Sequence, residues 1–467
     1  MERIKAISPL DGRYSGKTEV LSQYFSEEAL INFRIIVECE YFIFLIEELS
    51  NKKKKTKKLT QNQKEAIRAI YKDRIQNALL VKKIEFSGYK NIPATNHDVK
   101  AIEYFLRQSF SKIGLSDKME FLHFALTSED INNIAYSLMI AMSIKKEILI
   151  EAQNIISILK NYAIKYAGCP LLARTHGQSA VGTTFGKEFR IFRERAKRQI
   201  EAIKNARINI KLNGAVGNYN AHYASYPDID WIQFSFKFTR HLNKIFNLNL
   251  TTNLHTTQIE SHDSWIEIFD RFRHLNSIFV NLSQDIWLYI SDDLIKQKSN
   301  DGEIGSSTMP HKVNPIDFEN AEGNLLLANS LFSFFASKLP ISRLQRDLSD
   351  STVERNIGSA FAYSIIGYKS LLNGLGKIEV NEKKSREYLE ENIQIYSEGI
   401  QTILRREGIK NPYELLKKIT RGKKISKSKL LFFINSLKVS KKVKDELIAL
   451  LGKPYIGISE KLAKYRL

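Results

Sequence analysis

Apolar residues recur every three to four positions along several long stretches of the chain. The longest stripe runs through Ile131, Ile134, Leu138, Ile148, Ile155 and Leu159. This spacing places apolar side chains on one face of a helix and predicts the longest helix over about 127–163. The same period predicts helices over about 26–49, 61–82 and 265–289, and a further helix after Pro315.

Proline is rare and leaves three long gaps. None occurs between Pro93 and Pro170, between Pro227 and Pro310, or between Pro340 and Pro412. Because proline interrupts helices, gaps of this length favour long unbroken helices over a turn-rich β protein. The chain has 467 residues, 43% of them hydrophobic, which is enough for a large core divided among two or three domains.

We therefore predict an all-α protein of three helical domains with a central bundle of long helices. The predicted domains cover 1–117, 118–372 and 373–467, and a polar loop at 296–315 interrupts the central one. Beyond about residue 380 the helical patterns shorten and alternate with basic loops. The third domain therefore carries no chemistry that we can identify.

Charge and cysteine content restrict the function classes. The formal net charge of +20 could reflect binding of nucleic acid, binding of an anionic substrate, or a generally lysine-rich composition. The lysines are scattered, and the dense cluster at 51–58 has no interleaved aromatic residues, so we interpret it as a solvated loop. Cys39 and Cys169 lie far apart without metal spacing. With no signal-peptide pattern and no apolar run long enough to span a bilayer, we expect a cytoplasmic protein.

The segment 305–315, GSSTMPHKVNP, differs from the helical patterns on either side of it. It follows a polar run at 297–302 and precedes a helix, so we expect a mobile surface loop. Lys312, Asn314 and the free N–H groups of the following helix would favour a bound anion. From composition alone, a plain polar connection between helices is the simpler interpretation.

Two polar strings precede helical patterns and can be explained by capping. In Thr95-Asn96-His97-Asp98, either Asn96 or Asp98 could cap the next helix, and His97 could be a first-turn residue. Thr127 and Asp130 have capping-box spacing. Capping would account for the hydroxyls of Thr127 and Ser128 without catalysis, although a free helix N-terminus also binds a carboxylate.

Two further strings combine charged and hydroxyl side chains. In Arg174-Thr175-His176-Gly177-Gln178, the small polar neighbours of His176 indicate an open loop rather than a core position. The segment 343–356, RLQRDLSDSTVERN, alternates charges and hydroxyls in a way that a core helix would not. A solvated helix with ion pairs four residues apart is the structural alternative.

These strings together resemble the adenylosuccinate lyases of the fumarase/aspartase superfamily. The resemblance is carried by SPLDGRY at 8–14, NHDVKAIEYFL at 96–106, the THG string at 175–177 and GEIGSSTMPHKVNPIDFEN at 302–320. The histidine before Lys312, His311, resembles the motif of these lyases, whereas fumarases and aspartases usually carry glycine at that position. The resemblance implies β-elimination of fumarate from adenylosuccinate, giving AMP, and from the succinylated aminoimidazole carboxamide ribotide, giving AICAR.

The resemblance also implies roles for individual residues. Ser306 would be the general base and His176 the general acid, with Glu319 holding the imidazole and Lys312 stabilising the charge that develops on the substrate. The implied substrate contacts are Arg13, Tyr14, Asn96, His97, Asp98, Thr127, Ser128, Thr175, Gln258, Asn314, Arg346, Ser351 and Arg355. Arg346, Ser351 and Arg355 would bind the nucleotide phosphate, since forked guanidinium donors match phosphate geometry.

No metal or organic cofactor is implied, because the histidines show no ligand spacing and elimination needs none. The family resemblance implies a homotetramer whose sites combine segments of several subunits, and no nucleic-acid or membrane partner. Two alternatives stay open. A sibling enzyme of the argininosuccinate or carboxymuconate type would not need Arg346, Ser351 and Arg355. A non-catalytic helical oligomer that binds nucleic acid would have no reason to combine Ser306, His176 and the other catalytic candidates.

Overall fold

The computed structural model describes residues 3–52, 56–298, 309, 312–420 and 425–465. They form two compact units, each assembled from separate segments of the chain. Unit 1 consists of Met1–Ala152, Gln199–Ser277 and Gly323–Lys369; unit 2 consists of Gln153–Arg198, Ile278–Glu322 and Ser370–Leu467. The chain is mainly helical, which confirms the predicted all-α class. The contiguous three-domain division stays a prediction.

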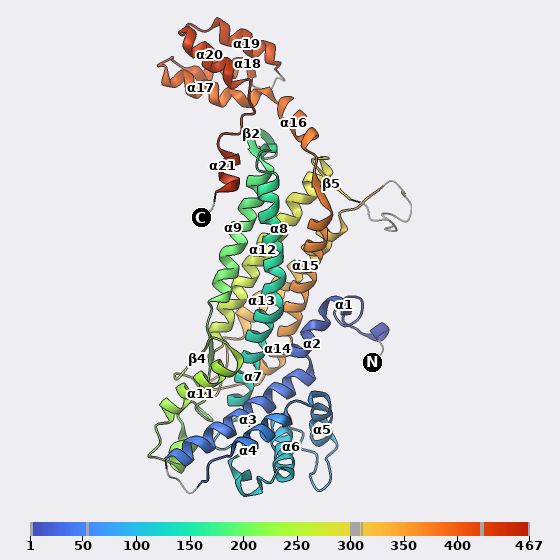
Figure 1. The fold of residues 1–467 in the computed structure, drawn as a ribbon, viewed down its shortest axis with the longest axis vertical. Coiled ribbons are helices and arrows are strands. Elements are labelled where there is room, and N and C mark those ends of the chain that lie inside the picture. The colour runs from blue at the N-terminus through green and yellow to red at the C-terminus, as the bar shows by residue number, and fades with distance from the viewer. Residues whose placement is uncertain (1–2, 53–55, 299–308, 310–311, 421–424, 466–467) are drawn as a thin grey trace. The chain divides into compact units, whose positions relative to one another are not determined.

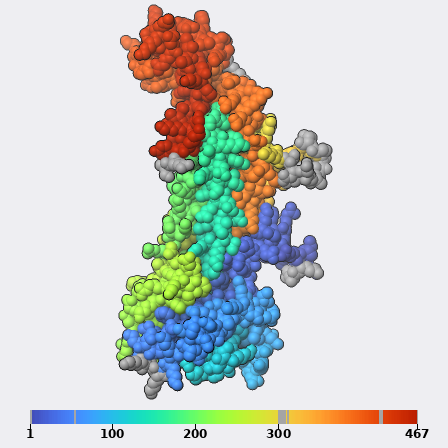
Figure 2. Space-filling view, in the orientation of Figure 1, coloured from blue at the N-terminus to red at the C-terminus, as the bar shows by residue number. Residues whose placement is uncertain are grey.

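Unit 1 begins with a group of helices in which α2, α4, α5 and α6 contact α3 (Figure 1), and this N-terminal part of the chain is blue in Figure 2. They are α1 (Ser15–Thr18), α2 (Ser22–Phe25), α3 (Glu27–Asn51), α4 (Gln61–Ile70), α5 (Arg74–Phe86) and α6 (Asp98–Lys112). Ile35, Phe42 and Ile46 of α3 are buried with Ile102 and Phe110 of α6 in one core. Burial of such side chains contributes roughly 1.5–3 kcal/mol each and holds α6 on α3.

The predicted helix over 61–82 was wrong as a single element, because the structure breaks it between Ile70 and Arg74. The side-chain amide of Asn77 donates to the carbonyl of Ile70 at 2.6 Å. This contact satisfies a carbonyl that would otherwise continue the helix, and it ends α4 there. Apolar periodicity carries no information about such a contact.

The long helix predicted over 127–163 is confirmed as α7 (Ser128–Ser143), a π-helical turn (Ile144–Ile148) and α8 (Leu149–Lys165). The carboxylate of Asp130 accepts a hydrogen bond from the N–H of Thr127 at 2.9 Å, as the capping spacing predicted. Asp130 also accepts from Lys211 Nζ at 2.7 Å, and neither side chain is exposed. The N-terminus of α7 is therefore fixed by a buried ion pair.

Further elements begin in unit 1, and some of them contribute to an aromatic core. They are β3 (Ile208–Ile210), α10 (Asn220–Ser225), α11 (Trp231–Phe246), β4 (Leu250–Thr252), α12 (Asp263–Ser291) and α14 (Ser349–Glu354), with β3 and β4 parallel. Phe272 of α12 stacks on Phe332, Phe269 packs against Phe332 at a tilt, and Phe361 packs edge-on against Phe272. The aromatic period of α12 is thus a core stripe.

Five long helices contribute residues to both units: α8, α12, α9 (Phe185–Lys204), α13 (Ile316–Lys338) and α15 (Ile357–Lys377). The helix predicted after Pro315 is confirmed as α13. Two antiparallel pairs lie in unit 2, β1 (Pro170–Thr175) with β2 (Gln178–Thr184) and β5 (Ile295–Gln297) with β6 (Ile378–Val380). Residues 296 and 297, expected to begin the polar loop, therefore belong to a strand.

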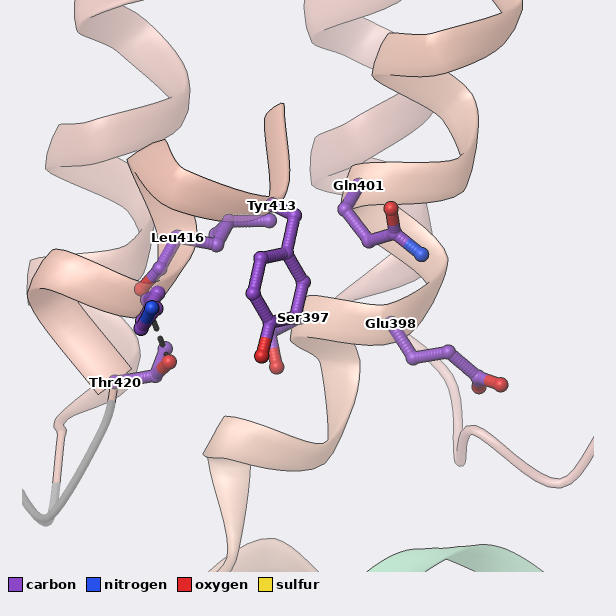
Figure 3. Close-up of a pocket in the computed structure, with 7 residues that line it drawn as sticks. Ser397, Glu398, Gln401, Tyr413, Leu416 and Thr420 are labelled. Carbon is purple, nitrogen blue, oxygen red and sulfur yellow. Dashed lines mark hydrogen bonds between the residues drawn. The ribbon is translucent and has the colours of Figure 1, made fainter. Parts of the chain in front are cut away.

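The C-terminal part of unit 2 is a group of short helices with its own core, as the shortened pattern predicted (Figure 1). The helices are α16 (Glu382–Glu390), α17 (Ser397–Arg406), α18 (Pro412–Thr420), α19 (Lys427–Ser436) and α20 (Lys441–Leu450). The last helix, α21 (Ser459–Lys464), lies outside this core, beside β2. A pocket at α17 and α18 is lined by Ser397, Glu398, Gln401, Tyr413, Leu416, Lys417 and Thr420 (Figure 3). None of the predicted site residues lines it.

Among the described residues, the helices include none with both the length and the apolar character needed to cross a bilayer.

Candidate active site

Arg346 is held in place by three side chains in unit 1. Its Nη1 donates to the side-chain oxygen of Gln258 at 3.1 Å, and its Nη2 lies 3.4 Å from Glu129 and 4.0 Å from Asp350. The N–H of Gln258 donates in turn to the carbonyl of Gln345 at 3.3 Å. The structure thus brings together two predicted substrate contacts, Gln258 and Arg346, from segments far apart in the sequence.

Arg355 is tied to the N-terminus of α6. Its Nη2 donates to the Asp98 carboxylate at 3.1 Å and its Nη1 to Glu27 at 3.1 Å, while the side chain remains 42% exposed. Ser351, one turn earlier, donates to the carbonyl of Leu348 at 3.1 Å. Arg355 therefore keeps a solvent-facing part that an anion could reach. The solvated-helix interpretation of 343–356 does not hold, because only Ser349–Glu354 is helical.

The first turn of α6 differs from both predicted capping schemes. His97 itself is the N-cap residue, and its Nδ1 accepts from the N–H of Lys100 at 3.2 Å. Asp98 accepts instead from the N–H of Val99 at 2.8 Å and from the guanidinium of Arg34 at 2.7 Å. Asn96 precedes them with φ near +48°, a conformation that asparagine tolerates better than most residues. This capping bond fixes the ring of His97, whose other edge is exposed.

Asp98 is a carboxylate between two arginines. Burial alone would raise the pKa of Asp98, but the charges and hydrogen bonds of Arg34, Val99 and Arg355 hold that pKa below its usual value. Asp98 is therefore ionised at neutral pH and attracts Arg355 electrostatically.

A buried group of charged side chains lies directly behind Arg346. We call Glu129, His262, Arg346, Asp350 and Glu354 the Glu129 cluster. His262 Nε2 lies 2.9 Å from Glu354, and Glu129, His262 and Glu354 offer donor atoms within 4.8 Å of one another. A divalent cation could use such donors, but the guanidinium of Arg346 already faces Glu129. Arginine and protons can therefore neutralise the cluster without a metal.

Burial and the nearby Glu354 raise the pKa of Glu129 to about 8. For His262, burial alone would lower the pKa, but the hydrogen bond to Glu354 and its charge raise it. Oε1 of Glu129 and Nδ1 of His262 are buried and find no hydrogen-bond partner among the residues that the structure describes. The cluster thus holds more carboxylate than its single arginine balances, and protons reside there readily.

His176 lies at the tip of the β1–β2 hairpin in unit 2. Thr175 pairs with Gln178, so His176 and Gly177 alone form the turn, with φ near +53° and +72°. Positive φ at both central residues is the type I′ geometry that matches strand twist. The imidazole is exposed and, within the described part of the chain, makes no hydrogen bond. The expectation of an open position is confirmed, although the strands were not predicted.

The other unit 2 candidates flank the residues that the structure leaves undescribed. Ser306 and His311 lie outside the described residues. Lys312 is exposed and its N–H donates to the carbonyl of Met309 at 3.1 Å, and Asn314 is partly buried just before α13. Glu319, in the first turn of α13, accepts from Trp287 Nε1 at 3.1 Å.

The predicted pairing of Glu319 with His176 stays a prediction. Within the described residues, no hydrogen bond or ion pair joins Glu319 to His176, and the pairing of these two groups is untested in a single chain. In unit 1, Arg13 is exposed and Tyr14 is partly buried in the turn before α1, as the turn-rich start predicted. Thr127 and Ser128 open α7, next to Glu129 of the Glu129 cluster.

Sequence reasoning missed the buried charges Arg34, Glu129, His262 and Glu354. A signal for Arg34 existed, since it stands among Leu30, Ile31, Phe33 and Ile35 in a mainly apolar stretch. Charged side chains are seldom buried unless they are paired, so an arginine in such a stretch indicates a buried partner. The identity of that partner could not be read from the sequence.

Comparison with known proteins covers almost the whole chain. The family profile described as "Lyase" matches residues 12–328, and that described as "Adenylosuccinate lyase C-terminal" matches 342–456. The chain is 46% identical over 466 residues to the adenylosuccinate lyase of Dictyostelium discoideum, covering 98% of this chain and 97% of the relative. It is 43% identical over 459 residues to that of Escherichia coli strain K12, with 98% and 97% covered.

Solved structures of similar fold include a fumarate lyase from Mesorhizobium sp. BNC1, with a TM-score of 0.70, 16% identity and 96% of each chain covered. A 3-carboxy-cis,cis-muconate lactonizing enzyme from Pseudomonas putida has a TM-score of 0.69, 17% identity and 95% of each chain covered. At these identities the likeness concerns the fold alone.

Proposed function

We propose that this chain, which belongs to the adenylosuccinate lyase family, removes fumarate from adenylosuccinate to give AMP. It would also convert the succinylated aminoimidazole carboxamide ribotide to AICAR. The observation that carries the proposal is the match to adenylosuccinate lyases over nearly the full length. That match includes a C-terminal profile that begins at residue 342 and so contains Arg346, Ser351 and Arg355.

Arg346 and Arg355 bind the nucleotide phosphate in this proposal. Its support is the geometry of unit 1, where Gln258 and Glu129 fix the guanidinium of Arg346 and Arg355 keeps an exposed part. A guanidinium held in advance loses little further freedom when it binds an anion. Ser351, Arg13 and Tyr14 add contacts to the nucleotide, and His97 and Asp98 bind near the leaving nitrogen with Asn96 beside them.

The succinyl group brings two carboxylates. Thr127 and Ser128 would bind one of them, which is supported by their place at the N-terminus of α7, where backbone N–H groups favour an anion. Lys312 and Asn314 would bind the other, just before the N-terminus of α13. Proton removal beside a carboxylate places further negative charge on it, so these donors stabilise the transition state most.

Two proton transfers complete the elimination. Ser306 takes a proton from the carbon beside the carboxylate, and His176 gives one to the departing nitrogen as the C–N bond breaks. The exposed hairpin tip supports the role of His176, because it presents the imidazole to a ligand without local hydrogen bonds. Thr175 orients the substrate next to it, and Glu319 steadies the imidazolium from another segment. No metal or organic cofactor takes part in this scheme.

The functional unit is a homotetramer in this proposal, with sites shared between subunits. Large apolar side chains support it, since Leu326, Leu327 and Phe334 of α13 are about half exposed, at 50%, 50% and 51%. Apolar surface of this kind on a long helix is typical of a subunit interface. We also place the protein in the cytoplasm, which the two unpaired cysteines Cys39 and Cys169 support.

The proposal is tested by following fumarate release from adenylosuccinate by the purified full chain. We expect turnover by the wild type and a loss of roughly 10²–10⁴-fold in each of His176→Ala and Ser306→Ala. Lys237→Met, at an exposed position with no assigned role, is the matched control. Absence of turnover by the wild type would reject the function, and unchanged turnover in both variants would reject the assignments.

A further inference from the structure

Arg34 is a buried arginine with two specific partners. It lies in α3, its side chain is only 3% exposed, and its neighbours Ile31, Phe33 and Ile35 are buried. Its Nη1 donates to Asp98 at 2.7 Å and its Nε to the side-chain oxygen of Asn132 at 2.9 Å. A guanidinium is costly to bury, so both acceptors are needed to hold it there.

Each acceptor of Arg34 leads to one of the two phosphate-binding arginines. Asp98 also accepts from Arg355 at 3.1 Å through the same oxygen that accepts from Arg34. On the other side, the amide of Asn132 donates to Glu129 at 3.4 Å, and Arg346 lies 3.4 Å from that same Glu129 oxygen. Arg34 is therefore the midpoint of a continuous polar chain from Arg355 to Arg346.

The position of Arg34 changes how strongly Asp98 can hold Arg355. Arg34 is buried and permanently charged, so it neutralises much of the Asp98 carboxylate whether or not a ligand is bound. Arg355 is 42% exposed and interacts with the part of the Asp98 charge that Arg34 does not neutralise. If Arg34 were absent, Asp98 would pair fully with Arg355, and an incoming phosphate would have to compete with that pairing.

We infer that Arg34 is a positioning residue for the nucleotide phosphate, which leaves Arg355 available and fixes Arg346 through Asn132 and Glu129. The inference rests on the proposed function, because it takes Arg346 and Arg355 as the phosphate contacts. A purely structural Arg34, which only joined α3 to α6 and α7, would affect phosphate-bearing and phosphate-free ligands equally. That difference separates the two roles.

The test compares inhibition by the two products, AMP and fumarate, because only AMP carries phosphate. In Arg34→Met we expect the inhibition constant of AMP to rise about tenfold, the effect of losing one charge-assisted contact. The fumarate constant should stay within about twofold, and kcat should fall less than KM rises. Arg34→Lys keeps the charge beside Asp98 but cannot also reach Asn132, so we expect a rise in the AMP constant of only about threefold.

Arg68→Met is the matched control. Arg68 also pairs with a carboxylate of α3, contacting Glu40 at 2.8 and 2.9 Å, but it lies outside the polar chain. It should leave the ratio of the AMP and fumarate constants unchanged. If Arg34→Met does not fold, the same ratio in Arg34→Lys decides the question.

Equal shifts of the two constants, or no shift in either, would overturn the positioning role. Direct calorimetry of AMP binding gives the same comparison without turnover. If the wild-type protein binds AMP but releases no fumarate from adenylosuccinate, the proposed function is refuted. The role of Arg34 is then still decided by the AMP affinities of its variants.

Discussion

Nε2 of His262 lies 2.9 Å from the carboxylate of Glu354, and neither side chain is open to solvent. Glu129 and Asp350 add two more buried carboxylates around the single guanidinium of Arg346. Burial raises the pKa of Glu129, and the charge of Glu354 raises it further. Burial would lower the pKa of His262, but the hydrogen bond and charge of Glu354 raise it. The folded state therefore binds more protons in the Glu129 cluster than the unfolded chain does at neutral pH.

These raised pKa values predict that stability falls as pH rises. Because the pKa of Glu129 is raised, the folded state keeps a proton that the unfolded chain releases between about pH 4.5 and about pH 8. The unfolding free energy therefore declines as pH rises across that window. His262 acts in the same direction, because the stability from its raised pKa is complete below about 6.5 and is lost as pH rises through the folded value. In Glu129→Gln we expect a decline that is shallower by up to about 1.4 kcal/mol per pH unit.

Denaturant unfolding between pH 5 and 8 measures this slope. Glu391→Gln, at an exposed position, is the matched control and should keep the wild-type profile. A Glu129→Gln profile parallel to that of the wild type would contradict the shifted protonation of the cluster.

The ion pair of Lys211 with Asp130 predicts a large stability loss. Both side chains are fully buried, and Lys211 Nζ donates to Asp130 at 2.7 Å and to the carbonyl of Gly214 at 2.7 Å. Lys211→Met leaves a buried carboxylate without its cation and should cost about 3–5 kcal/mol. Lys237→Met, which removes a 45% exposed lysine 3.5 Å from Glu48, should cost less than about 1 kcal/mol. Comparable losses in the two variants, measured by denaturant unfolding, would refute the prediction.

The hairpin turn predicts that activity and stability separate at His176. Asparagine tolerates positive φ, so His176→Asn should keep the turn and unfold within about 2 °C of the wild type. Its turnover of adenylosuccinate should nevertheless fall by roughly 10²–10⁴-fold. His255→Asn makes the same change at another exposed histidine and should be fully active. An active His176→Asn would remove His176 from the mechanism.

The exposed apolar residues of α13 predict an effect on assembly. The double change Leu326→Glu and Leu327→Glu places charges where two half-exposed leucines would be buried between subunits. We expect light scattering to detect dissociation of the tetramer, with loss of turnover, because the sites are shared. Phe432→Glu alters a 78% exposed side chain of α19 and should leave the assembly intact. A tetrameric double variant would place the interface elsewhere.

Periodicity predicted the long helices because an apolar stripe depends on local spacing alone. This explains the agreement at α3, α7 with α8, α12 and α13. It failed where a single side chain decides the backbone, as at Asn77, which captures the carbonyl of Ile70. It also missed the β1–β2 hairpin, because that segment shows no clear alternation and the His-Gly turn was the one local signal.

The candidate site was predictable where its residues form unusual polar strings, and not where the contacts are long-range. Gln258 and Arg346 were both named from the family resemblance, but their 3.1 Å contact joins segments 88 residues apart. Glu129 and His262 attract no notice in the sequence, since one is a first-turn acid and the other precedes a helix. Glu129 and His262 become notable only because both are buried in the same cluster, and this proximity is visible only in the folded chain.

The turn between β1 and β2, which carries His176, has only two residues and so has the minimum length of a hairpin loop. Any residue inserted between Thr175 and Gln178 would replace the tight reversal with a wider loop and turn the ring away from its present direction. We therefore expect substitutions, but no insertions, to be compatible with the position of His176 in this hairpin. The length of the turn is constrained as strictly as the identity of its histidine.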